Sequence, residues 1–152
     1  MNAIDSEGRV ENLAGKLKTR GMRITPQRMA VLKIIATSTK HPSIEQIYEQ
    51  VKRDFPMTSL ATIYKTINTL EQMGEVREIT LHDGGNRYDG YEPAPHPHFV
   101  CTECGKISDV DIANLTQLAD EVAEKYGYQI YNQRLDFFGV CSDCQKTITK
   151  SR

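Results

Sequence analysis

The sequence lacks any apolar segment long enough to cross a membrane. No window approaches the roughly 18 apolar residues of a membrane-spanning helix, and residues 1–7 carry no apolar core of a secretion signal. We therefore expect a cytoplasmic protein without a membrane partner. Repeats and low-complexity tracts are also absent apart from two Cys-x-x-Cys pairs, so the 152 residues fit one or two small domains.

Cysteine is scarce, and all four cysteines fall in the two pairs Cys101/Cys104 and Cys141/Cys144. A chain of this length builds a sufficient core without disulfides, and a reducing compartment disfavours them. Four thiolates close a tetrahedron around Zn²⁺ and leave no open position for catalysis. The spacing therefore predicts a structural zinc site, with free buried thiols or a redox disulfide as the alternatives.

The net charge of −1 conceals a difference between the two halves of the chain. Residues 1–74 contain eleven Lys or Arg and seven Asp or Glu, a net charge of +4, whereas residues 75–152 contain eight and thirteen, a net charge of −5. A basic half favours a polyanion partner and an acidic half favours cations. Ordinary variation in composition explains the charges equally well.

Apolar periodicity and capping residues predict four helices in the basic half. The first covers residues 9–20, and the others begin after Thr25, Ser43 and Ser59. The last of them ends at Gly74. Four of its residues are expected to face the core: Leu60, Ile63, Ile67 and Leu70.

A β-hairpin is predicted next, because the short segments 75–81 and 86–91 flank the turn sequence Asp83-Gly84-Gly85. Helices followed by a hairpin predict a winged helix-turn-helix DNA-binding domain over residues 1–91. The proline-rich stretch at about residues 91–97 then predicts a stiff hinge.

Residues 98–152 read as an α/β domain. An amphipathic helix is expected over residues 112–126, ending at Gly127, between strand-like segments at 99–101 and 128–140. These strands are too few to cover every sheet edge, so pairing with a second copy is expected. The predicted fold class is α+β: an N-terminal winged helix-turn-helix domain and a C-terminal α/β dimerisation domain with a Cys₄ zinc site.

Two histidines precede the first cysteine pair and indicate a second metal site. In an extended segment His96 and His98 share one face while Cys101 points to the other, so the imidazoles need not bind the zinc ion. Asp89 and Asp109 lie within reach in the sequence. Such a set suits Fe²⁺, Mn²⁺ or Zn²⁺, although each residue taken singly fits a hydrogen-bonded histidine or a solvated carboxylate.

The outward positions of the fourth predicted helix suit DNA contact. Ala61 and Thr62 are small, while Tyr64 and Lys65 have the length to reach phosphates or a thymine methyl group. The helix is the last before a hairpin, which favours a recognition helix over a solvated polar face. Arg23 fits a phosphate or minor-groove contact, and equally an exposed surface position.

The sequence resembles the ferric uptake regulator family in segments that follow in order across nearly the whole chain. They are Gly21-Met22-Arg23-Ile24-Thr25-Pro26-Gln27-Arg28, His41-Pro42, Ser59-Leu60-Ala61-Thr62-Ile63-Tyr64, Arg87-Tyr88-Asp89, His96-x-His98 and both Cys-x-x-Cys pairs. Iron-uptake members commonly have Glu at the positions of Asp89 and Asp109. The two aspartates make the chain most similar to the peroxide-responsive repressor branch.

This resemblance implies a homodimeric, metal-dependent transcriptional repressor and not an enzyme. Zn²⁺ would bind the four cysteines, and the regulatory Fe²⁺ or Mn²⁺ would bind His41, Asp89, His96, His98 and Asp109. The metal-loaded dimer would bind palindromic, A·T-rich double-stranded operator DNA. In the peroxide-responsive branch, the reaction of Fe²⁺ with hydrogen peroxide adds oxygen to a ligand histidine, here His41 or His96, and the repressor leaves the DNA.

Other functions compete with this one. Within the family, the alternative is an iron-responsive uptake regulator with reversible Fe²⁺ binding and no self-oxidation. Asp111 competes with Asp109 as the carboxylate ligand, and Gln133 replaces a histidine found in many members, which argues against a third metal site there. Outside the family, a zinc hydrolase needs an open metal position and a nearby base, and a zinc-stapled interaction module leaves the His/Asp set unexplained.

Overall fold

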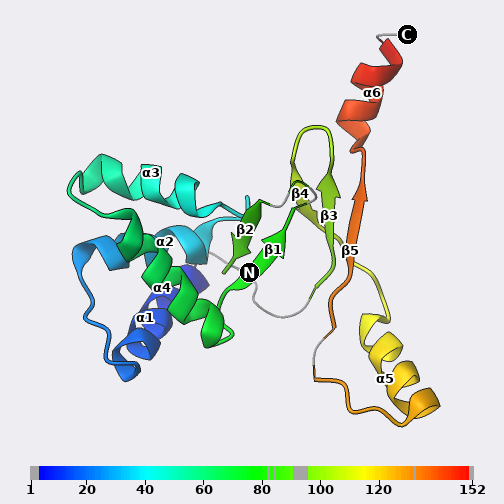
Figure 1. Ribbon diagram of the computed structural model, residues 1–152, viewed down its shortest axis with the longest axis horizontal. Helices are drawn as coiled ribbons and strands as arrows, with labels where there is room; N and C mark the ends of the chain where they lie inside the picture. Colours follow the sequence, from blue (N-terminus) through cyan, green and yellow to red (C-terminus); the bar gives the residue numbers. More distant parts are fainter. Residues whose placement is uncertain (1–3, 82, 84, 91–95, 132, 151–152) are drawn as a thin grey trace. The chain divides into compact units, whose positions relative to one another are not determined.

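The computed structural model describes residues 4–81, 83, 85–90, 96–131 and 133–150. The chain divides into two compact units, Met1–Pro93 and Ala94–Arg152, called here the N-terminal and the C-terminal unit. Each has its own sheet (Figure 1). The predicted hinge at about residues 91–97 falls mostly outside the described residues. In the described part of the chain, no helix has the length and apolar character of a membrane span.

The N-terminal unit contains the four predicted helices, and three of them begin at the predicted N-cap residues. They are α1 (Ile4–Thr19), α2 (Pro26–Thr37), α3 (Ile44–Asp54) and α4 (Leu60–Gln72). The Thr25 hydroxyl accepts from Arg28 N, and Ser43 forms a complete capping box with Gln46. Helix α1 begins before the predicted residue 9, because its first turns precede the apolar stripe on which the prediction relied.

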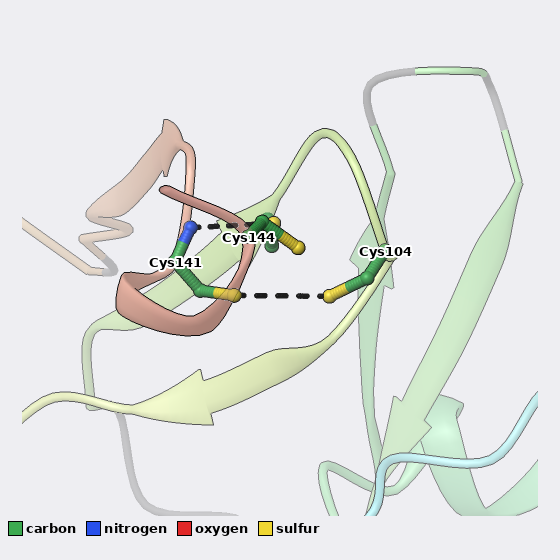
Figure 2. Close-up of side chains that lie close together, drawn as sticks. Cys104, Cys141 and Cys144 are labelled. Atoms are coloured by element: carbon green, nitrogen blue, oxygen red, sulfur yellow. Dashed lines mark hydrogen bonds between the residues drawn. The ribbon is translucent and has the colours of Figure 1, made fainter. Parts of the chain in front are cut away.

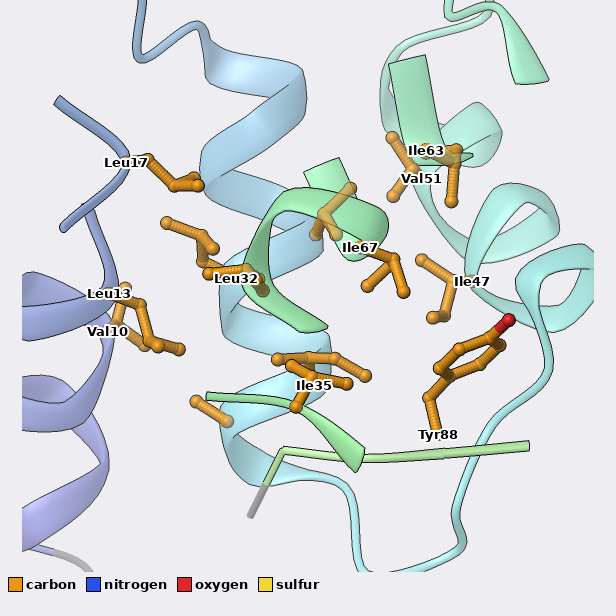
Figure 3. Close-up of a cluster of buried hydrophobic side chains, with 14 of the residues drawn as sticks. Val10, Leu13, Leu17, Leu32, Ile35, Ile47, Val51, Ile63, Ile67 and Tyr88 are labelled. Atoms are coloured by element: carbon orange, nitrogen blue, oxygen red, sulfur yellow. The ribbon is translucent and has the colours of Figure 1, made fainter. Parts of the chain in front are cut away.

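One hydrophobic core joins these four helices (Figure 3). It contains fully buried side chains from every helix: Leu13, Leu17, Leu32, Ile35, Ile47, Ile63, Ile67 and Leu70. The expectation that Leu60 faces this core is wrong, since its side chain is 39% exposed. Leu60 is the first residue of α4, one turn before Ile63, where the buried stripe begins.

The predicted hairpin follows α4 and completes a winged helix. Gly74 ends α4 with a φ of +74°, a left-handed conformation that glycine adopts without steric cost. Strands β1 (Arg77–Thr80) and β2 (Asn86–Asp89) then pair antiparallel, with Arg77 opposite Asp89. This hairpin, the wing, therefore carries one of the predicted metal ligands at its end.

The C-terminal unit has a three-stranded sheet in the order β4-β3-β5. The elements are β3 (His98–Cys101), β4 (Ile107–Asp109), α5 (Leu115–Tyr126), β5 (Asp136–Gly139) and α6 (Ser142–Lys150). Strand β3 is antiparallel to β4 and parallel to β5. Two expectations need correction: among the described residues of the segment 128–140 only Asp136–Gly139 form a strand, and the helix predicted over 112–126 begins at Leu115. Strand β4 and helix α6, both short and polar, were not predicted.

Helix α5 is amphipathic as predicted, but its apolar side is not covered by the described part of this chain. Leu118, Val122 and Tyr126 are 50%, 40% and 56% exposed, and Phe138 of β5 is 50% exposed. Side chains of this size normally lie in a core or an interface. The C-terminal unit thus exposes the apolar surface that the predicted pairing with a second copy would cover.

Candidate metal centres

The four cysteines meet where the ends of two parallel strands lie side by side. Cys101 is the last residue of β3 and lies opposite Gly139 of β5, two residues before Cys141. One sulfur atom from each cysteine lies within 4.8 Å of the others. Figure 2 shows Cys104 and Cys141 pointing toward each other, with their sulfur atoms 3.9 Å apart. Residues far apart in sequence thus form a compact set of four thiols.

The surroundings of these thiols fit a bound cation. The backbone N–H groups of Cys104 and Cys141 lower the pKa of Cys101 to about 6, and Cys141 N donates to Cys101 Sγ over 3.3 Å. The thiol contacts of Cys141 and Cys104 instead raise the pKa of Cys144 to about 12. Four thiolates this close need a divalent cation to compensate their charge, and Zn²⁺ suits four sulfur ligands.

A second set of ligand atoms lies where β3 begins and β4 ends, in the same unit. His98 lies opposite Asp109 in the register, and Asp109 Oδ1 is 3.1 Å from His96 Nε2 and 3.5 Å from His98 Nε2. The two imidazole rings are 4.4 Å apart. The predicted ligands His96, His98 and Asp109 are therefore brought together on one side, separate from the cysteines.

Asp136 supports this set from the neighbouring strand, and the sequence analysis missed it. Its Oδ1 lies 3.4 Å from His98 Nδ1, and Arg134 Nε donates to its Oδ2 over 2.7 Å. A carboxylate behind a ligand histidine fixes the ring and its tautomer. The relevant signal is the pairing of Asp136 with His98 in parallel strands, which cannot be read from a single sequence.

The N-terminal unit brings together the two other predicted ligands. His41 Nε2 lies 3.6 Å from Asp89 Oδ2, and both side chains are only 2% exposed. The backbone of His41 has a φ of +53°, a left-handed conformation that is uncommon for residues other than glycine. A buried imidazole and carboxylate at this distance offer two donors of the kind that divalent transition metals bind.

Three hydrogen bonds connect the segment around His41 to strand β2. Arg87 Nε donates to the His41 carbonyl and Arg87 Nη2 to the Lys40 carbonyl, the latter over 2.9 Å. The backbone N–H of Tyr88 donates to the Pro42 carbonyl over 3.0 Å. In the sequence Arg87 and Tyr88 stand in the family motif Arg87-Tyr88-Asp89, and no role for them was predicted. Three successive carbonyl groups are thus held by the strand that carries Asp89.

Residues 19–138 match the Ferric uptake regulator family. The chain belongs to this family. It is 34% identical over 139 residues to the "Peroxide-responsive repressor PerR" of Staphylococcus aureus (strain USA300), an alignment that covers 91% of this chain and 93% of that protein. The family and this relative are named as regulators.

Solved structures of ferric uptake and peroxide stress regulators are also similar to this chain. The Campylobacter jejuni peroxide stress regulator is 36% identical with a TM-score of 0.70, over 87% of this chain and 98% of that one. The Helicobacter pylori ferric uptake regulator Fur is 26% identical with a TM-score of 0.80, over 92% and 93%. Both branches of the family that the sequence analysis weighed are therefore among the structural relatives.

The predicted DNA contacts lie on α4 and before α2. Ala61, Tyr64 and Lys65 are exposed, whereas Thr62 is half-buried and its hydroxyl lies 3.0 Å from that of Ser59. Arg23 is exposed as well. Helix α4, the last helix before the wing, thus has three of its four predicted contact residues exposed.

Two departures from the family pattern also have a place in the structure. Asp111 is exposed and belongs to neither metal-binding group among the residues described. Gln133 Nε2 donates to the Leu115 carbonyl over 3.0 Å. Gln133 therefore ties the segment before β5 to the start of α5 in this chain.

Proposed function

We propose that this protein is a homodimeric repressor that binds operator DNA when its regulatory site holds Fe²⁺ or Mn²⁺, and that peroxide oxidation of ligand histidines releases it. The observation that carries the proposal is the presence of two chemically different ligand sets. One is a closed group of four thiols, and the other consists of imidazoles and carboxylates. A closed sulfur site stabilises a fold, whereas nitrogen and oxygen ligands suit exchangeable borderline metals.

In this proposal Zn²⁺ is bound by the four cysteines and has a structural role. It joins the turn after β3 to the start of α6, two segments that contribute little apolar core of their own. The short strands of the C-terminal unit depend on such a link, because metal binding to a closed cysteine site is itself a source of folding free energy.

The regulatory ion would take ligands from both units. His41 and Asp89 provide two donors, and His96, His98 and Asp109 provide three. An ion held by all five fixes the angle between the DNA-binding unit and the dimerisation unit, so metal binding and DNA binding become coupled. Support comes from the burial of His41, Asp89 and His98, each 2% exposed, and from the short distances within each unit.

DNA binding would use the exposed side of α4. In a homodimer two copies of this helix enter successive major grooves, and the two-fold symmetry of the protein requires a palindromic operator, which we expect to be A·T-rich. Lys65 and Arg23 would contact phosphates, while Ala61, Thr62 and Tyr64 would lie near base edges. Dimerisation would cover the exposed apolar side chains of α5 and β5.

Peroxide sensing would follow from the choice of metal. Fe²⁺ held by the regulatory ligands would activate hydrogen peroxide. The O–O bond would break, one oxygen would leave as water, and the other would be added to a ligand imidazole, which loses two electrons. His41 and His96 are the proposed targets. An oxidised imidazole is a poorer donor, so the ion leaves and the two units lose their fixed orientation. Mn²⁺ would support DNA binding without this reaction.

A gel-shift assay tests the proposal. Zinc-loaded protein is incubated with Mn²⁺ or Fe²⁺ and a palindromic A·T-rich duplex, before and after hydrogen peroxide. We expect metal-dependent binding that peroxide abolishes only with Fe²⁺, together with one added oxygen on the peptides that contain His41 or His96. The peptide with His82 serves as the control, since His82 is not a proposed ligand.

Two other outcomes separate the alternatives. Metal-dependent binding that survives peroxide with Fe²⁺, without oxidised histidine, supports the iron-responsive uptake regulator instead. DNA binding that needs no regulatory metal contradicts both forms of the proposal.

A further inference from the structure

Arg87 lies in the wing of a proposed DNA-binding unit, where an arginine would ordinarily be assigned to a DNA phosphate. Its guanidinium group is instead directed at the backbone of the neighbouring loop. Nε donates to the His41 carbonyl and Nη2 to the Lys40 carbonyl. The side chain is half-buried, and burial lowers the pKa of its guanidinium. The guanidinium of Arg87 therefore binds protein backbone and not a DNA phosphate.

The loop that Arg87 holds has an unfavourable backbone conformation. His41 has a φ of +53° and precedes Pro42, whose ring restricts the residue before it to extended conformations. A left-handed residue at such a position persists only where surrounding contacts hold it. The two hydrogen bonds that Arg87 donates, to the carbonyls of Lys40 and His41, are such contacts.

The same strand holds the next carbonyl and carries the partner carboxylate. Tyr88 N donates to the Pro42 carbonyl over 3.0 Å, and Asp89 follows with its Oδ2 3.6 Å from His41 Nε2. Three successive residues of β2 therefore contact the loop: Arg87 through its side chain, Tyr88 through its backbone N–H, and Asp89 through its carboxylate, which lies near His41. A displacement of strand β2 must therefore displace the loop, and a displacement of the loop must displace the strand.

We propose that Arg87 is a positioning residue for the regulatory metal: its forked guanidinium holds His41 in the left-handed conformation that aims the imidazole at Asp89, and so links the ligand pair to the wing. This inference rests on the proposed metal role of His41 and Asp89. An arginine is required because its rigid fork reaches two carbonyl groups together, whereas lysine offers a single ammonium centre.

The test compares Arg87→Lys, which keeps the charge, and Arg87→Gln, which removes it, in the zinc-loaded full-length protein. We expect both variants to bind Mn²⁺ about 10–100-fold more weakly, the usual cost of losing a group that orients a metal ligand. Mn²⁺ titration followed by electron paramagnetic resonance measures this affinity. Arg53→Lys is the matched control, because Arg53 is an exposed arginine of the same unit, and it should leave the affinity unchanged.

A second readout needs no regulatory metal. Hydrogen exchange of the Tyr88 amide, which donates to Pro42, should be faster in metal-free Arg87→Lys than in the wild type, while amides of the α2 core stay protected. Faster exchange throughout the N-terminal unit would indicate general unfolding and would overturn a specific positioning role.

The opposite result is equally definite. If Arg87 contacts a phosphate, Arg87→Gln lowers metal-free, non-specific DNA affinity and reduces the salt slope by about one, Arg87→Lys restores both, and Mn²⁺ affinity stays at the wild-type value. That pattern overturns the inference. His41→Ala identifies failure of the proposed function itself: unchanged Mn²⁺ affinity in that variant removes the ligand role of His41, whatever the Arg87 variants do.

Discussion

His98 and Asp136 face each other across the parallel strands β3 and β5, with Nδ1 3.4 Å from Oδ1. The two side chains are only 2% and 11% exposed. A carboxylate at this position favours the tautomer with the proton on Nδ1, which leaves Nε2, the atom nearer to Asp109, for a metal ion. Arg134 donates a hydrogen bond to the other carboxylate oxygen. Asp136 is thereby fixed and orients the His98 ring from the side opposite Asp109.

Replacing Asp136 by Asn should weaken metal binding at the proposed regulatory site. The amide has nearly the same shape as the carboxylate but carries no charge, so it makes the imidazole a poorer donor. We expect Mn²⁺ affinity to fall about 10–100-fold, measured by titration, with zinc content unchanged. Asp111→Asn is the control, because Asp111 is exposed and outside both metal-binding groups. Equal affinities in the two variants would contradict a supporting role for Asp136.

The parts of the fold that a local pattern encodes could be predicted from the sequence. Thr25, Ser43 and Ser59 cap helices because side-chain oxygens at these positions satisfy free backbone N–H groups a few residues later. The two cysteine pairs and the His-x-His unit likewise contain their ligand chemistry within a few residues. Such features need no knowledge of distant contacts.

Features that depend on pairing between distant segments could not be predicted. Asp136 acquires its role from the register of β3 and β5, and Arg87 from the loop 46 residues before it. Leu60 looked buried by periodicity alone, yet it lies one turn before the core begins. The role of His41 came only from a resemblance, because an isolated histidine gives no signal of the carboxylate that it meets.

Loss of one cysteine of the proposed zinc site should unfold the C-terminal unit selectively. Structural Zn²⁺ contributes on the order of 10 kcal/mol of folding free energy in small zinc domains. We therefore expect Cys144→Ser to lose its zinc and the fold of that unit, while the N-terminal unit retains its own hydrophobic core. Zinc analysis and calorimetry measure the effect, with Ser142→Ala as the control in the same turn. A zinc-free variant with both unfolding transitions intact would contradict this prediction.

The ion pairs of Glu75 predict how stability depends on pH. Burial raises the pKa of Glu75, but hydrogen bonds and charges from Lys16 and Arg9 outweigh it and lower the pKa below its usual value. A carboxyl group with a lowered folded-state pKa stabilises the protein above its unfolded-state pKa, and this contribution is lost as the pH falls through the folded-state value. The contribution is therefore complete well above the unfolded-state pKa of about 4.3 and falls as the pH drops below it.

Glu75→Gln should therefore reduce the free energy of unfolding at pH 7, and by less at pH 3. Urea denaturation at both pH values measures the two differences. Glu11→Gln, at an exposed position of α1, controls for the loss of one carboxylate. A stability difference for Glu75→Gln that stays constant across this range would show that the carboxylate charge is not the cause.

Lys65 should contribute to DNA affinity without reading sequence. Its exposed position on α4 suits a phosphate contact, so Lys65→Ala should weaken binding to all duplexes alike and reduce the slope of log affinity against log salt by about one. Lys18→Ala, exposed on α1, should leave the slope unchanged. A loss of affinity confined to one operator sequence would assign Lys65 to base contact instead.

Gly90 should be intolerant of any side chain, unlike Gly15. A Cβ atom at Gly90 would lie 2.7 Å from Ile35 Cγ2 and 3.2 Å from the Ile35 carbonyl oxygen, and the Gly90 carbonyl already accepts from Arg9. We expect Gly90→Ala to cost about 1–3 kcal/mol, and to lower Mn²⁺ affinity by displacing the adjacent ligand Asp89. Gly15→Ala, in the exposed middle of α1 with open space around it, should instead stabilise by about 0.5–1 kcal/mol. Urea denaturation measures both changes, and equal stability of the two variants would mean that Gly90 can shift without cost.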